Sequence, residues 1–293
     1  MCFLLVSFVL QKLQAMNTLS SNRVVVYLQS QENLNLLPQC YANLTAINLS
    51  SFHFGWSKTK PTLPYIHLND NMPGDPMFDS LWADMKAAQQ NGVLLIAMLG
   101  GAGGAYTTLF SQGNYEVFYP MFVNMLKKYN FQGVDLDVEE QVSQADIEKL
   151  IADLRKDFPT DFYITSAPVC SALQSGNNDP FSGINWYSIK DSIDWFNVQF
   201  YSGFGSLSTP DDYNSIIDNG FSASQILGGA LTNPADGGGY VAIATVAQTL
   251  QTLNTKYSGQ IGGAMGWEYF NANNASEQED PVGWATAMKN AVS

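Results

Sequence analysis

The chain has 293 residues, with 13 Lys and Arg against 26 Asp and Glu, which gives a formal net charge of −13. Nucleic acids and anionic membrane surfaces are bound by basic patches, so this balance argues against both as partners. The length suits one large α/β barrel or two small domains, and since no linker-like or low-complexity stretch interrupts the chain, we expect one domain.

The first segment, residues 1–15, holds an apolar run of the kind found in the core of a signal peptide. The run is too short to cross a bilayer as a helix. No Lys or Arg precedes it, and Met16 offers a second start. We expect either a cleaved signal and a secreted protein, or a cytoplasmic protein that starts at Met16. In both cases one domain follows over residues 16–293, and we expect it to be a monomer.

Short apolar runs alternate along the rest of the chain with longer amphipathic stretches, which predicts strands alternating with helices. The expected strands are Arg23–Leu28, Ala46–Phe54, Val93–Leu99, Gly133–Val138, Tyr163–Ala167, Trp195–Phe200, Ile226–Ala230 and Gly262–Trp267. The clearest expected helices are Asp79–Gln90, Tyr115–Tyr129, Gln144–Phe158, Asp211–Asn219, Val241–Asn254 and Trp284–Val292. This order predicts an α/β fold, a single (β/α)8 TIM barrel without an inserted α+β domain, whose functional residues lie at the C-terminal ends of the strands. A doubly wound sheet would need a glycine-rich turn after the first strand, and residues 28–37 contain no glycine.

An acidic alternation marks the fourth expected strand. Asp135, Asp137 and Glu139 alternate with three apolar residues, so three carboxylates point to one side of this strand. Like charges packed this closely raise the pKa of at least one of them, which leaves a protonated acid beside an ionised one. A solvated edge strand is the alternative, but the opposite face is too apolar for an edge. The pattern therefore indicates a catalytic strand that ends at Glu139, while Glu140 has the opposite parity and is expected to lie in the loop.

Glycines follow the third expected strand. Gly100 and Gly101 open the run Gly-Gly-Ala-Gly-Gly. The run is either a turn that needs positive φ or a loop without side chains that gives a substrate room to approach the acids. A phosphate-binding loop is a weaker alternative, because no Lys followed by Ser or Thr comes after it.

Polar and aromatic residues end two other strands. Asn197, Gln199 and Tyr201 share one face at the sixth strand. Such groups are costly to bury in a barrel unless they are hydrogen-bonded, so they form either an internal network or part of a site. Trp267 ends the eighth strand, where a tryptophan is either ordinary core or a floor for a sugar ring.

The cysteines and histidines are few. The chain has three cysteines with no Cys-x-x-Cys pair, and two histidines, so we expect no metal site and no cofactor. Cys40 and Cys170 are expected to be buried free thiols, with a disulfide between them as the alternative.

Taken together, these residues resemble glycoside hydrolase family 18. The family motif Asp-Gly-x-Asp-x-Asp-x-Glu is matched from Gly133 to Glu139, with Gln132 in place of the first Asp. The other matching positions are Gly100, Gly101, Gln199, Tyr201 and Trp267, while Met98 stands where the family has a small residue. From about Arg23 to the C-terminus, the chain is similar to the fungal single-domain endo-β-N-acetylglucosaminidases, most clearly over residues 51–54, 67–70, 194–205 and 266–271.

The resemblance implies a retaining, substrate-assisted cleavage next to an N-acetylglucosamine unit, with the acetamido carbonyl of that sugar as nucleophile. It implies that Glu139 is the general acid and then the base. Asp137 would bind the acetamido N–H and stabilise an oxazolinium-like intermediate, while Asp135 would share a proton with Asp137. Tyr201 would orient the acetamido carbonyl. The residues implied to support the reaction or line the sugar site are Asn197, Gln199, Gly100, Gly101 and Trp267.

Two activities fit this resemblance: an endo-β-N-acetylglucosaminidase that cuts the chitobiose core of N-glycans on glycoproteins, and a compact chitinase. The likeness to the fungal subgroup, the absence of a second carbohydrate-binding domain and a short stretch of about thirty residues between the seventh and eighth strands favour the first. A non-catalytic lectin on the same fold is a rival of another class, but such proteins lose the terminal Glu or the Tyr. The expected partner is an N-glycoprotein or another glycan that contains N-acetylglucosamine. Candidate contacts for distal sugars are Trp56, Tyr65 and Tyr106.

Overall fold

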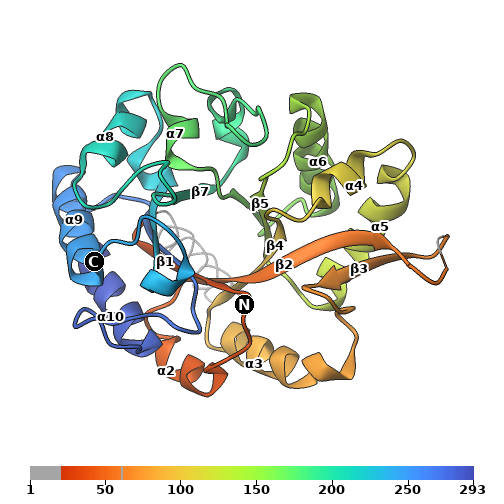
Figure 1. Ribbon diagram of the computed structural model, residues 1–293, viewed down its shortest axis with the longest axis horizontal. Helices are drawn as coiled ribbons and strands as arrows, with labels where there is room; N and C mark the ends of the chain where they lie inside the picture. Colours follow the sequence, from red (N-terminus) through yellow and green to blue (C-terminus); the bar gives the residue numbers. More distant parts are fainter. Residues whose placement is uncertain (1–20, 61) are drawn as a thin grey trace, which may run out of the picture.

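A computed structural model describes residues 21–60 and 62–293, so the expected signal segment, 1–15, lies outside the described residues. Parallel strands pair in the order β1-β9-β8-β7-β6-β5-β4-β2, and β1 also pairs with β2, so the sheet closes on itself. The strands are β1 Arg23–Leu28, β2 Ala46–Trp56, β4 Leu94–Gly100, β5 Gly133–Asp137, β6 Tyr163–Ser166, β7 Trp195–Gln199, β8 Ile226–Leu231 and β9 Gly263–Trp267. In Figure 1 the strands surround the centre of the molecule and the helices lie outside them, which confirms the predicted TIM barrel.

Side chains of the barrel strands alternate between two layers. In β1, Val24 and Val26 pack outward in the main hydrophobic core, whereas Val25 and Tyr27 belong to a second cluster inside the barrel. Both faces of β1 are covered by these layers, and every residue of β1 is buried. This explains why the strands are nearly continuous apolar runs, as parallel sheets covered on both faces usually are.

The helices cover the outside of the barrel. They are α2 Leu37–Cys40, α3 Asp79–Gln90, α4 Ala105–Phe110, α5 Tyr115–Lys128, α6 Gln144–Asp157, α7 Cys170–Leu173, α8 Asp211–Asp218, α9 Ile243–Lys256 and α10 Pro281–Val292. Short 3-10 segments add η1 Leu34–Leu36, η2 Pro76–Phe78, η3 Trp186–Ser192, η4 Ala223–Gln225 and η5 Pro234–Asp236. In α6 the Ser143 side chain caps the first turn, and the apolar spacing buries one face against the sheet. Over the part of the chain that the structure describes, no helix is long and apolar enough to span a membrane.

One hairpin departs from the expected barrel. Strand β3, Pro64–Leu68, pairs antiparallel with the second half of β2. The hairpin projects beyond the ring of helices at the right of Figure 1. The segment between β8 and β9 holds η5 and α9, an ordinary connection for a barrel of this type. Cys40 and Cys170 are both free and buried, as expected.

Candidate active site

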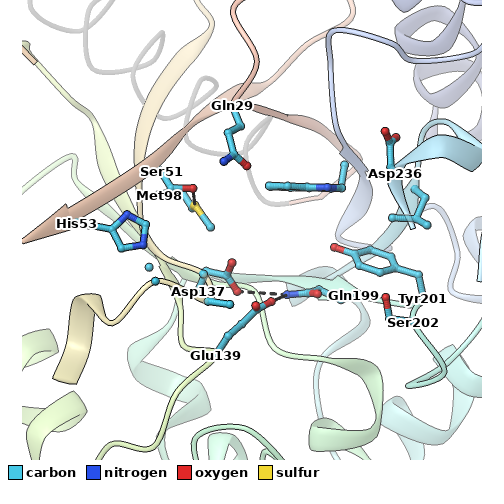
Figure 2. Close-up of a pocket in the computed structure, with 16 residues that line it drawn as sticks. Gln29, Ser51, His53, Met98, Asp137, Glu139, Gln199, Tyr201, Ser202 and Asp236 are labelled. Carbon is cyan, nitrogen blue, oxygen red and sulfur yellow. Dashed lines mark hydrogen bonds between the residues drawn. The ribbon is translucent and has the colours of Figure 1, made fainter. Parts of the chain in front are cut away.

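A cavity of about 360 Å³ opens where the barrel strands end. Its lining comes from the C-terminal ends of β1, β2, β4, β5, β7, β8 and β9 and from the loops that follow them. Asp137, Glu139, Gln199, Tyr201 and Trp267 are among the residues that line it, and Figure 2 shows most of them facing a common centre. The structure therefore brings together the residues that the sequence placed at separate strand ends.

The three carboxylates of the acidic alternation lie at three depths. Asp135 is fully buried inside the barrel and Asp137, the last residue of β5, is 5% exposed. Glu139 lies two residues beyond the end of β5, at the mouth of the barrel. Asp137 and Glu139 line the cavity, whereas Asp135 lies beneath it. The alternation of a strand produces this stack, because every second side chain points into the barrel.

Asp135 is surrounded by donors. The Tyr27 hydroxyl donates to Asp135 Oδ2 at 2.5 Å, and Asn197 Nδ2 donates to Oδ1 at 2.9 Å. The Thr165 hydroxyl also donates to Oδ1. Burial raises the pKa of Asp135, and these three hydrogen bonds oppose that rise because they favour the ionised form. Three donors, from β1, β6 and β7, thus hold Asp135.

The surroundings of Asp137 favour the neutral form of its carboxyl. Burial raises its pKa well above the usual range, and the negative charges of Glu139 and Asp135 raise it further. The side-chain amide of Gln199 donates toward Asp137 Oδ1 at 3.2 Å, Glu139 Oε1 at 3.3 Å and the Ala167 carbonyl oxygen at 2.8 Å. Gln199 therefore fixes the two carboxyls that line the cavity relative to the barrel wall.

Tyr201 and Trp267 form further walls of the cavity. Tyr201 is 8% exposed, and Figure 2 shows its hydroxyl directed toward the middle of the cavity. Burial, followed by the charges of Asp137 and Glu139, raises its pKa well above the usual range, so the phenol remains a donor at neutral pH. The indole of Trp267 packs against the Tyr27 ring with centroids 5.5 Å apart. An apolar ring thus lies beside a row of hydrogen-bonding groups, which suits a sugar.

The glycine pair at the end of β4 fits closely against β5. Gly100 has φ 106°, and a Cβ there would lie 2.2 Å from the backbone oxygen of Asp137. Gly101 has φ 75°, and its N–H donates to that same oxygen at 2.9 Å. Positive φ, one of the two expected reasons for the glycines, therefore applies, and close packing of Gly100 against β5 adds another.

Several residues of the site were not expected from the sequence. Gln29, His53 and Asp236 line the cavity, and Tyr27 and Thr165 bind Asp135. Tyr27 and Thr165 occupy strand positions whose side chains point into the barrel, so the sequence held a signal for these two residues. Gln29 follows β1, His53 lies within β2 and Asp236 ends η5, and a single sequence carries no pattern that selects them.

One other expectation has a clear outcome. Tyr106, a candidate for distal sugars, is fully buried and its hydroxyl donates to the Leu99 carbonyl oxygen at 2.8 Å, so its contact with a ligand is excluded by packing. Within residues 21–60 and 62–293, no group of three or more His, Cys, Asp or Glu residues could hold a metal ion.

Comparison with known proteins places this site in a family. The family described as glycosyl hydrolases family 18 matches residues 23–286. The structure of a fungal endo-beta-N-acetylglucosaminidase from that family aligns with a TM-score of 0.81 and 35% identity, over 92% of this chain and 97% of that chain. The chitinase ChiC from Aspergillus fumigatus aligns with a TM-score of 0.78 and 34% identity, over 93% of this chain and all (100%) of that chain.

Curated relatives are chitinases. Endochitinase 4 of Metarhizium anisopliae is 27% identical over 63% of this chain and 77% of its own length. Endochitinase 37 of Trichoderma harzianum is 28% identical over 63% of this chain and 65% of its own length, so the match spans less than two thirds of that relative. Because the family match runs through nearly the whole described barrel and includes the acidic strand, the chain belongs to glycoside hydrolase family 18, a family of glycosidases.

Proposed function

We propose that the protein is an endo-β-N-acetylglucosaminidase that hydrolyses the GlcNAc-β-1,4-GlcNAc bond in the core of N-linked glycans. The observation that carries this choice is the likeness to the fungal endo-beta-N-acetylglucosaminidase, which extends over 97% of that chain. The connection between β8 and β9 holds only η5 and α9, so no inserted domain walls the cavity on that side. A cavity without such a wall suits a branched glycan attached to a protein.

Glu139 is the proposed general acid and base. It lies at the mouth of the barrel, where a glycosidic oxygen can reach it. In the first step the acetamido carbonyl oxygen attacks the anomeric carbon, the glycosidic C–O bond breaks, and the leaving oxygen takes the proton of Glu139. In the second step Glu139 removes a proton from water, which attacks the same carbon and reopens the cyclic intermediate. Two displacements at one carbon retain its configuration.

Asp137 and Tyr201 are the proposed partners of the acetamido group. Asp137 lies beside Glu139, and both carboxyls accept from the side-chain amide of Gln199. The Asp137 carboxyl also accepts the acetamido N–H and stabilises the positive charge of the intermediate. The Tyr201 hydroxyl donates to the acetamido carbonyl and aligns it for attack.

The remaining predicted residues position these groups. Asp135, held by three donors, supplies a fixed negative charge beneath Asp137. Asn197 holds Asp135, and Gln199 holds both Asp137 and Glu139. Trp267 is the proposed floor under the sugar ring, while Gly100 and Gly101 leave space beside it.

A chitinase is the second candidate. Chitinase ChiC is 34% identical over the same part of the chain, and the curated relatives are endochitinases. Both activities need the same acids and the same acetamido group, so the two candidates differ only in what lies beyond the sugar being cut.

The experiment that separates them offers both substrates to the unaltered protein. Intact-protein mass spectrometry of a high-mannose glycoprotein after incubation is expected to show one N-acetylglucosamine left at each former glycan. No mass shift, together with short oligomers released from colloidal chitin, would transfer the assignment to chitinase. Silence on both substrates would contradict both candidates.

A further inference from the structure

We propose that Glu140 is a positioning residue that holds residues 101–104, the glycine loop, clear of the side of the cavity that receives the leaving group. The inference rests on the proposed function and deepens it, since it assigns that side of the cavity to an N-acetylglucosamine unit still attached to a polypeptide.

The side chain of Glu140 binds the first turn of α4. Its Oε1 accepts a hydrogen bond from the Tyr106 N–H at 2.7 Å, and its Oε2 accepts one from the Thr107 N–H at 3.0 Å. The Thr107 hydroxyl also donates to Oε2. A single carboxylate thus satisfies three donors at the start of α4, directly after the glycine loop.

Two further contacts hold the glycine loop. At its start, the Gly101 N–H donates to the backbone oxygen of Asp137 at 2.9 Å. In its middle, a Cβ on Gly103 would lie 2.0 Å from Nε2 of His53, so the backbone packs directly on the imidazole. The loop consists of three glycines and one alanine and has great conformational freedom to lose, so its position depends on such external contacts. Glu140 supplies the contact at the end of the loop.

The glycine loop forms one wall of the cavity. Figure 2 shows His53, which this loop covers, on one side of Asp137 and Glu139, and Tyr201 and Ser202 on the other. The proposed function places the acetamido group of the retained sugar at Asp137 and Tyr201, and the leaving oxygen at Glu139. The leaving group then extends from Glu139 away from Tyr201, along the glycine loop. A wall made of backbone leaves space there for a polypeptide chain.

Glu139 and Glu140 are consecutive in the chain but have different roles. Glu139 points into the cavity, while Glu140 points to α4 and fixes the wall beside the leaving group. Loss of the Glu140 contacts frees the end of the glycine loop, which then moves into space that a bulky leaving group needs. A small leaving group tolerates this movement better than a large one.

The test compares two substrates with the same retained glycan and different leaving groups. One is a high-mannose glycoprotein, and the other is the same glycan released with both core N-acetylglucosamine units. For Glu140→Gln, kcat/KM on the glycoprotein is expected to fall at least about tenfold more than on the free glycan. Thr107→Val, which removes one of the three donors, shifts the ratio in the same direction by less. Glu116→Gln changes an exposed carboxylate on α5 and leaves the ratio unchanged.

Each other outcome contradicts either the role of Glu140 or the proposed function. Equal losses on both substrates contradict the inference, because a merely structural role lowers the active fraction for both alike. Should Glu140→Gln fail to fold, an unchanged substrate ratio in Thr107→Val contradicts the inference in its place. If the unaltered protein cuts neither substrate, the proposed function fails and the inference falls with it.

Discussion

Asp137 and Glu139 share one hydrogen-bond donor: the side-chain nitrogen of Gln199 lies 3.2 Å from Asp137 Oδ1 and 3.3 Å from Glu139 Oε1. The charge of Glu139 is also the largest cause, after burial, of the raised pKa of Asp137. A change of charge at Glu139 is therefore expected to alter the proton affinity of Asp137.

Asp137→Asn tests the raised pKa through stability. The native protein keeps a proton on Asp137 that the unfolded chain releases above about pH 4. The native state then binds more protons than the unfolded state, so this residue makes the protein less stable as pH rises from about 4 toward the native pKa. Asparagine has no such proton to lose. We expect the unfolding temperature of the variant, relative to the unaltered protein, to increase between pH 4 and pH 7; a constant difference across that range contradicts the raised pKa.

Tyr27→Phe tests the hydrogen bonds that hold Asp135 beneath Asp137 and Glu139. The change removes one of the donors to the fully buried Asp135 and is expected to lower the free energy of unfolding by about 1–3 kcal/mol, measured by urea denaturation. Tyr115→Phe is the matched control, because the Tyr115 hydroxyl donates to Asp153, a carboxylate near the surface, at 2.9 Å. Its expected cost is smaller, since water replaces the lost donor. Equal costs would show that the Asp135 bond does not stabilise the barrel more than a surface bond.

Tyr201→Phe tests the alignment of the acetamido group. The variant keeps the ring that packs inside the barrel and loses the hydroxyl that faces the cavity. We expect kcat to fall about 10²–10³-fold with a small change in KM, because the hydroxyl acts mainly as the nucleophile attacks. A raised KM with normal kcat would instead assign Tyr201 to simple binding.

Trp267→Ala tests the sugar floor. Loss of the indole is expected to weaken glycan binding by about 1–2 kcal/mol, or roughly tenfold, and Trp267→Phe is expected to retain part of it. Calorimetry on an inactive Glu139→Gln background separates binding from turnover. Unchanged affinity in Trp267→Ala would show that the indole only packs in the barrel against Tyr27 and does not bind the sugar.

The sequence predicted most of the barrel because its strands carry a strong local pattern. Every expected barrel strand is present with bounds that shift by at most two residues. Strand β3, Pro64–Leu68, was missed, because its pairing with β2 is a tertiary contact and its residues lack a clear alternation. The short helices α2, α4 and α7 were also missed, since fewer than two turns are too short to show a helical period.

The candidate site was likewise predicted only in part. The parity of Asp135, Asp137 and Glu139 along one strand predicted their stacking, and the structure has it. The three donors to Asp135 come from strands far apart in the chain, so a single sequence could not pair them. Glu140 was expected to be a loop residue, and its contact with α4 could not be predicted because α4 itself was not predicted.

Glu139 is the proposed acid of this family 18 glycosidase, and the rate of hydrolysis by Glu139→Gln tests that role. The rate is measured on whichever of the high-mannose glycoprotein and colloidal chitin the unaltered protein cuts, with Glu116→Gln as the control. Glutamine keeps the shape of the side chain and its contact with Gln199 but cannot donate the proton. We expect a loss of at least about a hundredfold for Glu139→Gln and none for the control; near-normal turnover by Glu139→Gln would contradict the role of Glu139 as the acid.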